Sequence, residues 1–526
     1  MSTKGKGRRK AKARKQRPVY KDFNISRLGQ HARHGSTLSP PLNQIPGTTK
    51  TSWSDDHMPE MLWAVLLTGT LERQQYLECF RRVANLCKHW FEKPESGQSK
   101  EPFSPNHTIV VDQTGIAGFT DAQFEKFIDV ISSYPLSYAA LRPLLRIDSL
   151  PGKERWKNAL NLEPGDDDWT VLAHAIAGAL DHQSEASTDI RWFKLIFTII
   201  SGHMFFPQSM GDLTEELRLF PDKGDMRKVR PFIRSGEMML RRIPSSPWVQ
   251  SFWDELLGKT RCVDPTKQDD YPFDPTTIEP NSLYDARHQV IQRFLATMKA
   301  LRADARLDSA FGLVLYVLSI LEEVGRHHLH TLILGRLALR SLVEANITLR
   351  YLAEKDNDDL WKSYRVYGAG QAKLAFLKAQ ELQGELPTFL DEDALHTIAN
   401  EDVWQEYLDI DIGHWANSNL RKLAIECGAK ELYDKYYDWA STFAHSHWGA
   451  VRDTNFLTCH NALHRLHRIP RLAHRRLNTI EADSVGMVNE MLERLDKLYP
   501  AEAPLGKVGI AVREQNDGGA NAQVIV

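Results

Sequence analysis

The chain has 526 residues and a net charge of −2, and 42% of its residues are hydrophobic. This length exceeds that of one ordinary domain, so we expect two or three domains. No apolar run reaches the ~18–20 residues that span a bilayer, which predicts no membrane partner.

The five cysteines are scattered and contain no Cys-x-x-Cys pair. This pattern fits free thiols in a reducing cytoplasm and argues against a cysteine-based zinc site. Because the basic N-terminus has no apolar segment, we expect no secretory signal and a cytoplasmic location.

The charge of the chain is unevenly distributed. Residues 1–21 hold ten Lys or Arg and no acid, so subtracting their +10 from the total of −2 leaves −12 on the rest. The low complexity of this tail predicts that it is disordered. A basic tail can bind nucleic acid by neutralising phosphates, so we expect RNA or another nucleic acid as a partner. The alternative is a solubilising extension that has no specific partner.

Helical periodicity runs through most of the chain, without an alternating strand pattern of useful length. A basic tail and extended segment (1–50) precede a predicted N-terminal helical domain over residues 51–261. Residues 262–282 hold four prolines and many acids, which is typical of an interdomain linker. A helical bundle is predicted over 283–500, and a loose C-terminal tail over 501–526. The predicted fold class is therefore all-α, with two helical-bundle halves, a Pro/Asp-rich linker and a disordered basic N-terminus.

Nine helices are expected in the second half of the chain. Their predicted ranges are 283–304, 307–328, 330–354, 358–382, 391–407, 415–427, 430–448, 452–467 and 480–498.

The predicted helix at 330–354 is apolar on nearly every side, which is typical of a buried helix. It nevertheless carries Arg340 and Glu344, which are four residues apart and therefore on one face. Arg336 extends this face by one turn. Buried charges are costly unless they are paired, so the two residues form either a structural ion pair or part of a cleft.

A second polar stripe lies in the predicted helix at 430–448, where Tyr433, Tyr437, Ser441 and His445 recur at four-residue steps. A phenol, a hydroxyl and an imidazole on one face can serve general acid–base chemistry. The alternative is a hydrogen-bonded seam of the bundle. If this stripe packs against the central helix, the arginine and the glutamate join it in one pocket.

Two segments, RSLVEANITLRYL and HWANSNLRKLAIECGAKELYDKYYDWASTFAHSHW, resemble an uncharacterised bacterial all-helical family that is known only as a domain of unknown function. The shared pattern is an Arg-x-x-x-Glu helix, a Trp, and a Tyr…Tyr…Ser-x-x-x-His helix, over roughly residues 305–455. The positions in this chain that match the pattern are Arg340, Glu344, Trp415, Tyr433, Ser441 and His445. The resemblance implies an all-α fold and no particular activity.

Two further patterns involve histidines near the C-terminal end. Arg452-Asp453 followed by His460 is similar in kind to the Arg…His motif of HEPN-type helical ribonucleases, although seven residues intervene where four to six are usual. His460, His464 and His467 would share one face of the predicted helix at 452–467, which suits a transition metal or a phosphate. Because no acid completes a metal site there, we predict no metal and no cofactor.

The sequence favours an RNA- or nucleotide-directed effector that uses a polar pocket in the C-terminal bundle. A setting in phage defence or stress response follows from the resemblance alone. The expected activity is metal-independent and ribonuclease-like or phosphodiester-directed. In it, His445 would be the general acid–base and Arg340 would hold a phosphate. Glu344 would orient either His445 or Arg340. The candidate catalytic residues are Arg340, Glu344, Ser441 and His445. The candidate substrate-binding residues are Arg336, Trp415, Tyr433, Tyr437 and Arg452. The alternative is a non-catalytic helical scaffold or sensor for protein or nucleic-acid partners, and a homo-oligomer fits either function.

Overall fold

The computed structural model describes most of the chain. The described residues are 28–40, 52–91, 111–201, 211–238, 247–262, 275–298, 304–381, 387–401, 405–416, 418–465, 467–472 and 475–511. The basic tail at 1–21 lies outside them, as does most of the predicted linker.

Contacts between Cα atoms divide the chain into two compact units. Unit 1 comprises Met1–Val263 and Thr458–His467, and unit 2 comprises Asp264–Leu457 and Arg468–Val526. Unit 1 therefore takes a short segment from the C-terminal half, whereas the sequence analysis assigns all of residues 283–500 to one domain.

The described part of unit 1 consists of helices and one small strand pair, and it begins with η1 (Leu28–Gln30). The other helices follow in chain order. They are η3 (Trp53–His57), η4 (Pro59–Met61), α1 (Leu62–Thr70), α2 (Arg73–Phe91), α3 (Gln113–Ala117), α4 (Asp121–Ser132), α5 (Ser137–Leu141), η5 (Arg142–Arg146), α6 (Lys153–Leu160), α7 (Asp168–Leu180), α8 (Glu185–Ile200), α9 (Gly211–Arg218), α10 (Met226–Met238), α11 (Pro247–Lys259) and η11 (Ala462–His464). A small antiparallel strand pair, β1 (Ala32–His34) with β2 (Thr37–Ser39), lies near the N-terminus in sequence.

The core of unit 1 is built on aromatic rings. The side chain of Trp63 in α1 is fully buried, and its indole N–H donates to the carbonyl of Val111 at 2.9 Å. Its ring makes edge-to-face contacts with Phe80, Phe127 and Phe193 at centroid distances of 5.1–5.9 Å. Edge-to-face pairs align the positive ring edge with the negative ring face, so they fix the helices around α1 in addition to burying area.

Unit 2 is also helical. Its elements are α12 (Pro280–Thr297), α13 (Ala305–Arg326), η8 (Leu329–Thr331), α14 (Ile333–Lys355), α15 (Asp358–Glu381), α16 (Glu392–Ala399), η9 (Gln405–Tyr407), α17 (Leu420–Glu426), α18 (Lys430–Leu432), η10 (Tyr433–Tyr437), α19 (Asp438–Ala444), α20 (Trp448–Asn455) and α21 (Glu481–Leu498). The strands β3 (Phe456–Thr458) and β4 (Arg468–Pro470) pair at the edge of the segment that belongs to unit 1. The expected all-α fold class is confirmed.

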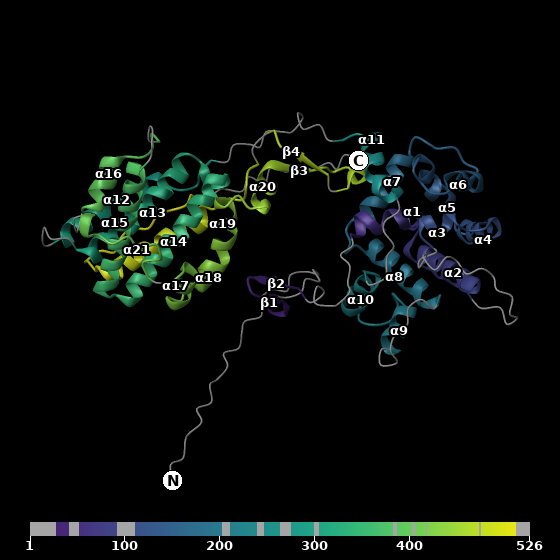
Figure 1. The fold of residues 1–526 in the computed structure, drawn as a ribbon, viewed down its shortest axis with the longest axis horizontal. Helices are drawn as coiled ribbons and strands as arrows, with labels where there is room; N and C mark the ends of the chain where they lie inside the picture. The colour runs from purple at the N-terminus through teal and green to yellow at the C-terminus, as the bar shows by residue number, and fades with distance from the viewer. Residues whose placement is uncertain are drawn as a thin grey trace, which may run out of the picture. The chain divides into compact units, whose positions relative to one another are not determined.

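The helix α14 is central to unit 2. It packs against α13 and α21 on one side and against α17 and α19 on the other, as the green and yellow ribbons of Figure 1 show. Leu342, Val343, Ile347, Leu349 and Leu352 are each at most 1% exposed. The helix is therefore buried on several sides, which agrees with its apolar sequence.

Several predicted helices differ from the observed ones. The helices expected at 391–407 and 415–427 are shorter, and are observed as Glu392–Ala399 and Leu420–Glu426. Two others are wrong over a longer stretch. The helix expected at 430–448 is interrupted by the π-helical turn η10 and ends at Ala444, because Ser446 has a left-handed backbone with φ of 50°. The helix expected at 452–467 ends at Asn455 and is followed by β3, η11 and β4. His460, His464 and His467 consequently do not share a helical face.

Among the described residues, none of the helices combines the length and the apolarity that crossing a lipid bilayer requires.

Candidate functional site

Arg340, Glu344 and Tyr437 form a contact network between two helical segments of unit 2. Nε of Arg340 lies 3.1 Å from Oε1 of Glu344, one turn along α14. Nη2 of Arg340 donates a hydrogen bond of 3.2 Å to the hydroxyl of Tyr437, and the guanidinium carbon lies 5.4 Å from the centre of the same ring. The ring of Tyr433 stacks on that of Tyr437 with a centroid distance of 4.7 Å. The network can form because η10 and α19 both pack on α14.

The charges of this network fix the protonation of the phenol. Burial raises the pKa of the Tyr437 hydroxyl, the hydrogen bond from Arg340 lowers it, and the negative charge of Glu344 raises it again, with a net upward shift. Tyr437 therefore stays neutral at physiological pH. Burial lowers the pKa of the Arg340 guanidinium, but its contacts with Tyr437 and Glu344 raise it more. The network thus presents one cation, one anion and one neutral phenol.

Glu344 and Tyr437 also line a cavity of about 1200 Å³ within unit 2. This volume is slightly above the range of about 300–1,000 Å³ that is usual for small-molecule sites. A second hollow of about 540 Å³ shares Glu344 and Thr348 with it. The larger cavity is bounded by α13, α14, α15 and the loop that leads into α17, so it lies among the helices of one unit.

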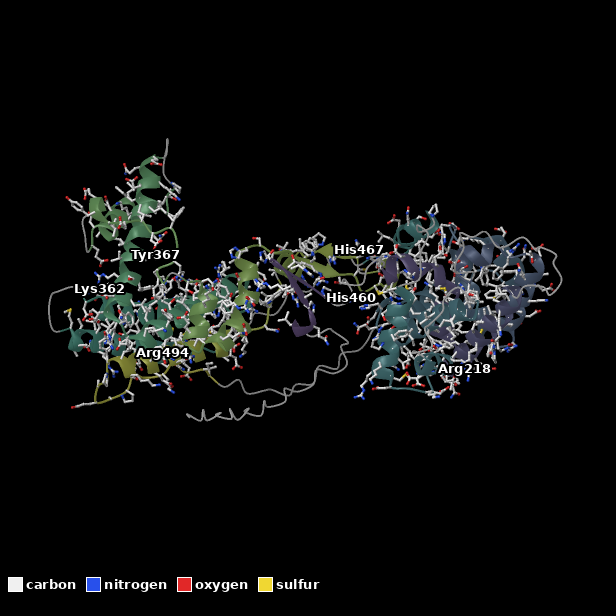
Figure 2. All side chains as sticks on the ribbon, turned by 60° about the horizontal axis from the view of Figure 1, so that its bottom comes forward. Arg218, Lys362, Tyr367, His460, His467 and Arg494 are labelled. Atoms are coloured by element: carbon white, nitrogen blue, oxygen red, sulfur yellow. The ribbon has the colours of Figure 1, made fainter. Side chains whose placement is uncertain are left out.

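Aromatic rings form much of the cavity wall. Trp415 meets Tyr364 of α15 edge to face at 5.3 Å, and the imidazole of His414 stacks on Trp415 at 5.4 Å. Burial lowers the pKa of His414, which favours its neutral form. Tyr367, labelled in Figure 2, donates from its hydroxyl to the carbonyl of Gly413 at 3.2 Å and so fastens the loop to α15. These residues present flat apolar faces beside polar edges.

Part of the wall is charged. Arg365 of α15 forms ion pairs with Asp308 of α13 and, at 3.2 Å, with Glu401. Its side chain is only 13% exposed. Lys422 of α17 also lines the cavity, is exposed, and takes part in no ion pair among the described residues. It is therefore the cation of the wall that is best placed to receive an anionic group.

Ser441 and His445 do not line this cavity. The π-helical turn η10 inserts an extra residue per turn, which rotates the following face by ~100° relative to an uninterrupted α-helix. His445 follows the end of α19, is exposed, and lies with its ring 5.8 Å from that of His447. The stripe expected from the sequence is thus divided, with Tyr433 and Tyr437 beside α14 and His445 away from them.

Four further candidate residues also lie outside the cavity wall: Arg340 and Tyr433, which contact Tyr437 from behind the wall, and Arg336 and Arg452. Arg336 is 7% exposed and donates to the carbonyls of His330, at 3.3 Å, and Asn478. Burial lowers its pKa. Its contacts fasten the start of α14 to the chain before α21, which is a structural role. Arg452 is exposed on α20.

Several cavity residues were not expected from the sequence. They are Asp308, Tyr364, Arg365, Tyr367, His414 and Lys422. The run SYRVYGAG in α15 carries two tyrosines and an arginine within four positions, and this polar-aromatic spacing was a usable signal. Lys422 and Asp308 had no such signal, because only the fold brings them beside α15.

Part of the cavity lies in a segment that matches a known protein family. Residues 335–462 match a family of unknown function (DUF5677). The expected resemblance to an uncharacterised family is therefore confirmed, over a segment that begins later than the predicted start near residue 305. No curated protein and no solved structure matches the chain.

The DUF5677 segment contains most of the cavity. All lining residues except Asp308 and Ser309 fall within residues 335–462. The network of Arg340, Glu344 and Tyr437 also lies inside the segment. The cavity is therefore a feature of the DUF5677 segment, completed by one helix from outside it.

Proposed function

We propose that unit 2 is a binding module whose cavity takes a nucleoside monophosphate. The observation that carries this proposal is the combination, in one cavity, of the aromatic wall around Trp415 with the polar network of Arg340, Glu344 and Tyr437. Stacking of a nucleobase on an aromatic side chain contributes about 1–3 kcal/mol and tolerates any base. Phenol, carboxylate and imidazole groups beside the rings supply hydrogen-bond partners for base edges and ribose hydroxyls.

The charge of the cavity sets the number of phosphates that it favours. Arg365 lies between two acids, Asp308 and Glu401, and Arg340 pairs with Glu344. Lys422 brings the summed charge of these groups to zero without pairing with any of the acids. The wall is therefore close to neutral with one exposed cation. Such a wall accepts a single phosphate on Lys422, whereas a triphosphate needs several cations or a metal ion.

Binding is better supported than catalysis. A phosphodiester reaction without a metal needs a general acid–base within hydrogen-bond reach of the reacting group. His445, the candidate for that role, is exposed beyond the end of α19 and does not line the cavity. The proposal therefore joins two expectations from the sequence, a nucleotide-directed protein and a non-catalytic sensor. In an effector of phage defence or stress response, this module would supply the sensing step.

Isothermal titration calorimetry of the full chain with the four common ribonucleoside monophosphates tests the proposal. Ribose 5-phosphate, which lacks a base to stack, is the control ligand. Lys422→Ala removes the exposed cavity cation, and Lys362→Ala is its matched control. Lys362 is also an exposed lysine on a helix of unit 2, does not line the cavity, and is labelled in Figure 2.

We expect at least one monophosphate to bind more tightly than ribose 5-phosphate. We expect Lys422→Ala to weaken this binding about tenfold, equivalent to ~1.4 kcal/mol, with Lys362→Ala unchanged. The proposal fails if no monophosphate binds, or if both lysine variants bind as tightly as the wild type.

A further inference from the structure

Four potential metal ligands from distant parts of the sequence meet in unit 1. The ligand atoms of Cys262, Cys459, His464 and His467 all lie within 4.8 Å of one another. Sγ of Cys262 is 3.9 Å from Sγ of Cys459 and 3.6 Å from Nδ1 of His467. Sγ of Cys459 is 3.4 Å from Nδ1 of His464. Cys262 closely follows α11, and the other three residues belong to the segment Thr458–His467.

These separations are those of a tetrahedral zinc site. With Zn–S bonds of about 2.3 Å and Zn–N bonds of about 2.0–2.1 Å, the edges of the tetrahedron are ~3.8 Å for S···S and ~3.5 Å for S···N. The separations of 3.9, 3.6 and 3.4 Å differ from these edges by a few tenths of an ångström at most. The remaining pairs lie within 4.8 Å, and small rotations of the exposed Cys262 and the partly exposed His467 can shorten them.

The hydrogen bonds around His464 leave the correct nitrogen free to coordinate. The hydroxyl of Thr260 donates to the carbonyl of Leu256 at 2.8 Å, so its oxygen is left to accept a bond. Nε2 of His464 lies 2.8 Å from that oxygen and 3.3 Å from Nδ2 of Asn461, and in the tautomer that coordinates through Nδ1 it donates its proton to Thr260. Nδ1 then carries the lone pair, and it faces Sγ of Cys459. Metal-binding histidines typically donate such a hydrogen bond from the ring nitrogen that does not coordinate the metal. This bond fixes the tautomer and the orientation of the ring.

The segment that carries three of these residues is held firmly in unit 1. Leu463 is 2% exposed in the core of unit 1, and Arg465 donates to Asp55 at 2.6 Å. The N–H of Cys459 donates to the carbonyl of His467 at 2.7 Å, which closes the segment into a compact loop. Cys459 and His464 are buried. The group is therefore already assembled by the fold.

We propose that Cys262, Cys459, His464 and His467 bind one Zn²⁺ ion. Two thiolates and two imidazoles in a tetrahedron select zinc over the harder cations. Four protein ligands leave no open position for a substrate, so the site is structural. Its effect is to fasten the segment Thr458–His467 to the end of α11 within unit 1. The site is independent of the cavity in unit 2.

Two other arrangements of the same residues make different predictions. A disulfide between Cys262 and Cys459 would leave three free thiols of the five cysteines in the chain. A group held only by thiol–imidazole hydrogen bonds would keep all five thiols and bind no metal.

Metal analysis of the full chain, purified under reducing conditions without a metal-chelate column, separates these cases. Zinc is measured by inductively coupled plasma mass spectrometry, and thiols are titrated after chelation and denaturation. His467→Gln removes a ligand, and His460→Gln is its matched control in the same segment, because His460 is exposed and outside the group. Figure 2 labels both histidines. Cys262→Ser removes an exposed ligand, so it perturbs the core little.

We expect about one zinc ion per chain in the wild type and in His460→Gln, as a site with four protein ligands predicts. We expect a severalfold lower zinc content in His467→Gln and in Cys262→Ser. Replacing zinc by Co²⁺ should give the visible and near-ultraviolet absorption of tetrahedral cobalt thiolate, which Cys262→Ser should weaken. Wild-type protein without zinc, equal zinc in the two histidine variants, or three thiols in place of five would each overturn the proposal.

Discussion

The guanidinium of Arg340 donates a hydrogen bond to the hydroxyl of Tyr437 at 3.2 Å, across 97 positions of sequence. The same guanidinium lies over the Tyr437 ring and pairs with Glu344. One arginine therefore holds both a tyrosine and a carboxylate of the cavity wall. Because each contact restricts the other, the two groups are positioned before any ligand arrives.

Tyr437→Phe should lower the stability of this part of unit 2 modestly. The substitution keeps the ring, and hence the cation–π contact, but removes one hydrogen bond to a charged group. We expect the opening free energy of α14 and α19 to fall by about 0.5–1.5 kcal/mol, measured by hydrogen–deuterium exchange of their peptides. Tyr433→Phe is the control, because the Tyr433 hydroxyl makes no hydrogen bond among the described residues. Equal effects of the two variants would contradict this account.

Substitution in a buried charge network of unit 1 should lower stability far more than Tyr437→Phe does in unit 2. Glu237 is fully buried and contacts Lys194 at 2.5 Å, Arg191 at 3.0 Å and His57 at 2.5 Å. Glu237→Gln removes the carboxylate that Lys194, Arg191 and His57 share, and so leaves the buried cations without that counter-charge. We expect a loss of about 3–5 kcal/mol, seen as faster exchange of α8 peptides. Glu215→Gln, which breaks an exposed pair, should leave that exchange unchanged.

The same network should make unit 1 sensitive to acid. Burial opposes the ionised form of Glu237, but the charges of Lys194, His57 and Arg191 outweigh it and hold the pKa of Glu237 well below its ordinary value of 4.5. Because the folded pKa lies below the unfolded one, the stabilisation is complete above pH 4.5 and is lost as the pH falls toward the folded pKa. Exchange of α8 peptides should therefore accelerate below that pH. Protection that stays constant down to the folded pKa would show that Glu237 is not ionised in the network.

Gly335 and Gly486, both in helices of unit 2, should respond to alanine with opposite signs. A Cβ at Gly335 would lie 2.2 Å from the carbonyl oxygen of Leu329, whereas a Cβ at Gly486 has nothing within 4 Å. Gly335→Ala should therefore cost about 1–3 kcal/mol, because backbone must move. Gly486→Ala should stabilise α21 by about 0.5–1 kcal/mol through helix propensity. Exchange protection of α14 and α21 measures both effects, and destabilisation by both variants would contradict this reading.

Local periodicity was sufficient to predict the long helices. The helix expected at 330–354 is observed as Ile333–Lys355, and the i,i+4 pair of Arg340 and Glu344 is present within it. The end of the second stripe could not be predicted, because a π-helical turn and a left-handed Ser446 leave no periodic signal. Short strands of three residues are likewise too brief for alternation to be recognised.

The groups of residues that the sequence analysis missed are formed by residues far apart in the sequence. Cys262 and Cys459 are separated by 197 positions, so their spacing does not resemble a zinc motif, and the sequence argues against one. His464 and His467 were noticed as potential metal ligands, but on a helix that does not exist and with His460 as their partner. Lys422 and Asp308 reach the cavity only through the packing of α13, α15 and α17. Such groupings follow from tertiary contacts, which one sequence does not encode in a readable local pattern.

The most direct test compares Arg340→Gln with His445→Gln by calorimetry, using the monophosphate that binds the wild type most tightly. Arg340 positions two groups of the cavity wall, whereas His445 lies beyond the end of α19. We predict that Arg340→Gln weakens binding about tenfold, or ~1.4 kcal/mol, and that His445→Gln leaves the dissociation constant unchanged. Loss of binding in His445→Gln with tight binding retained in Arg340→Gln would contradict the cavity as the nucleotide site.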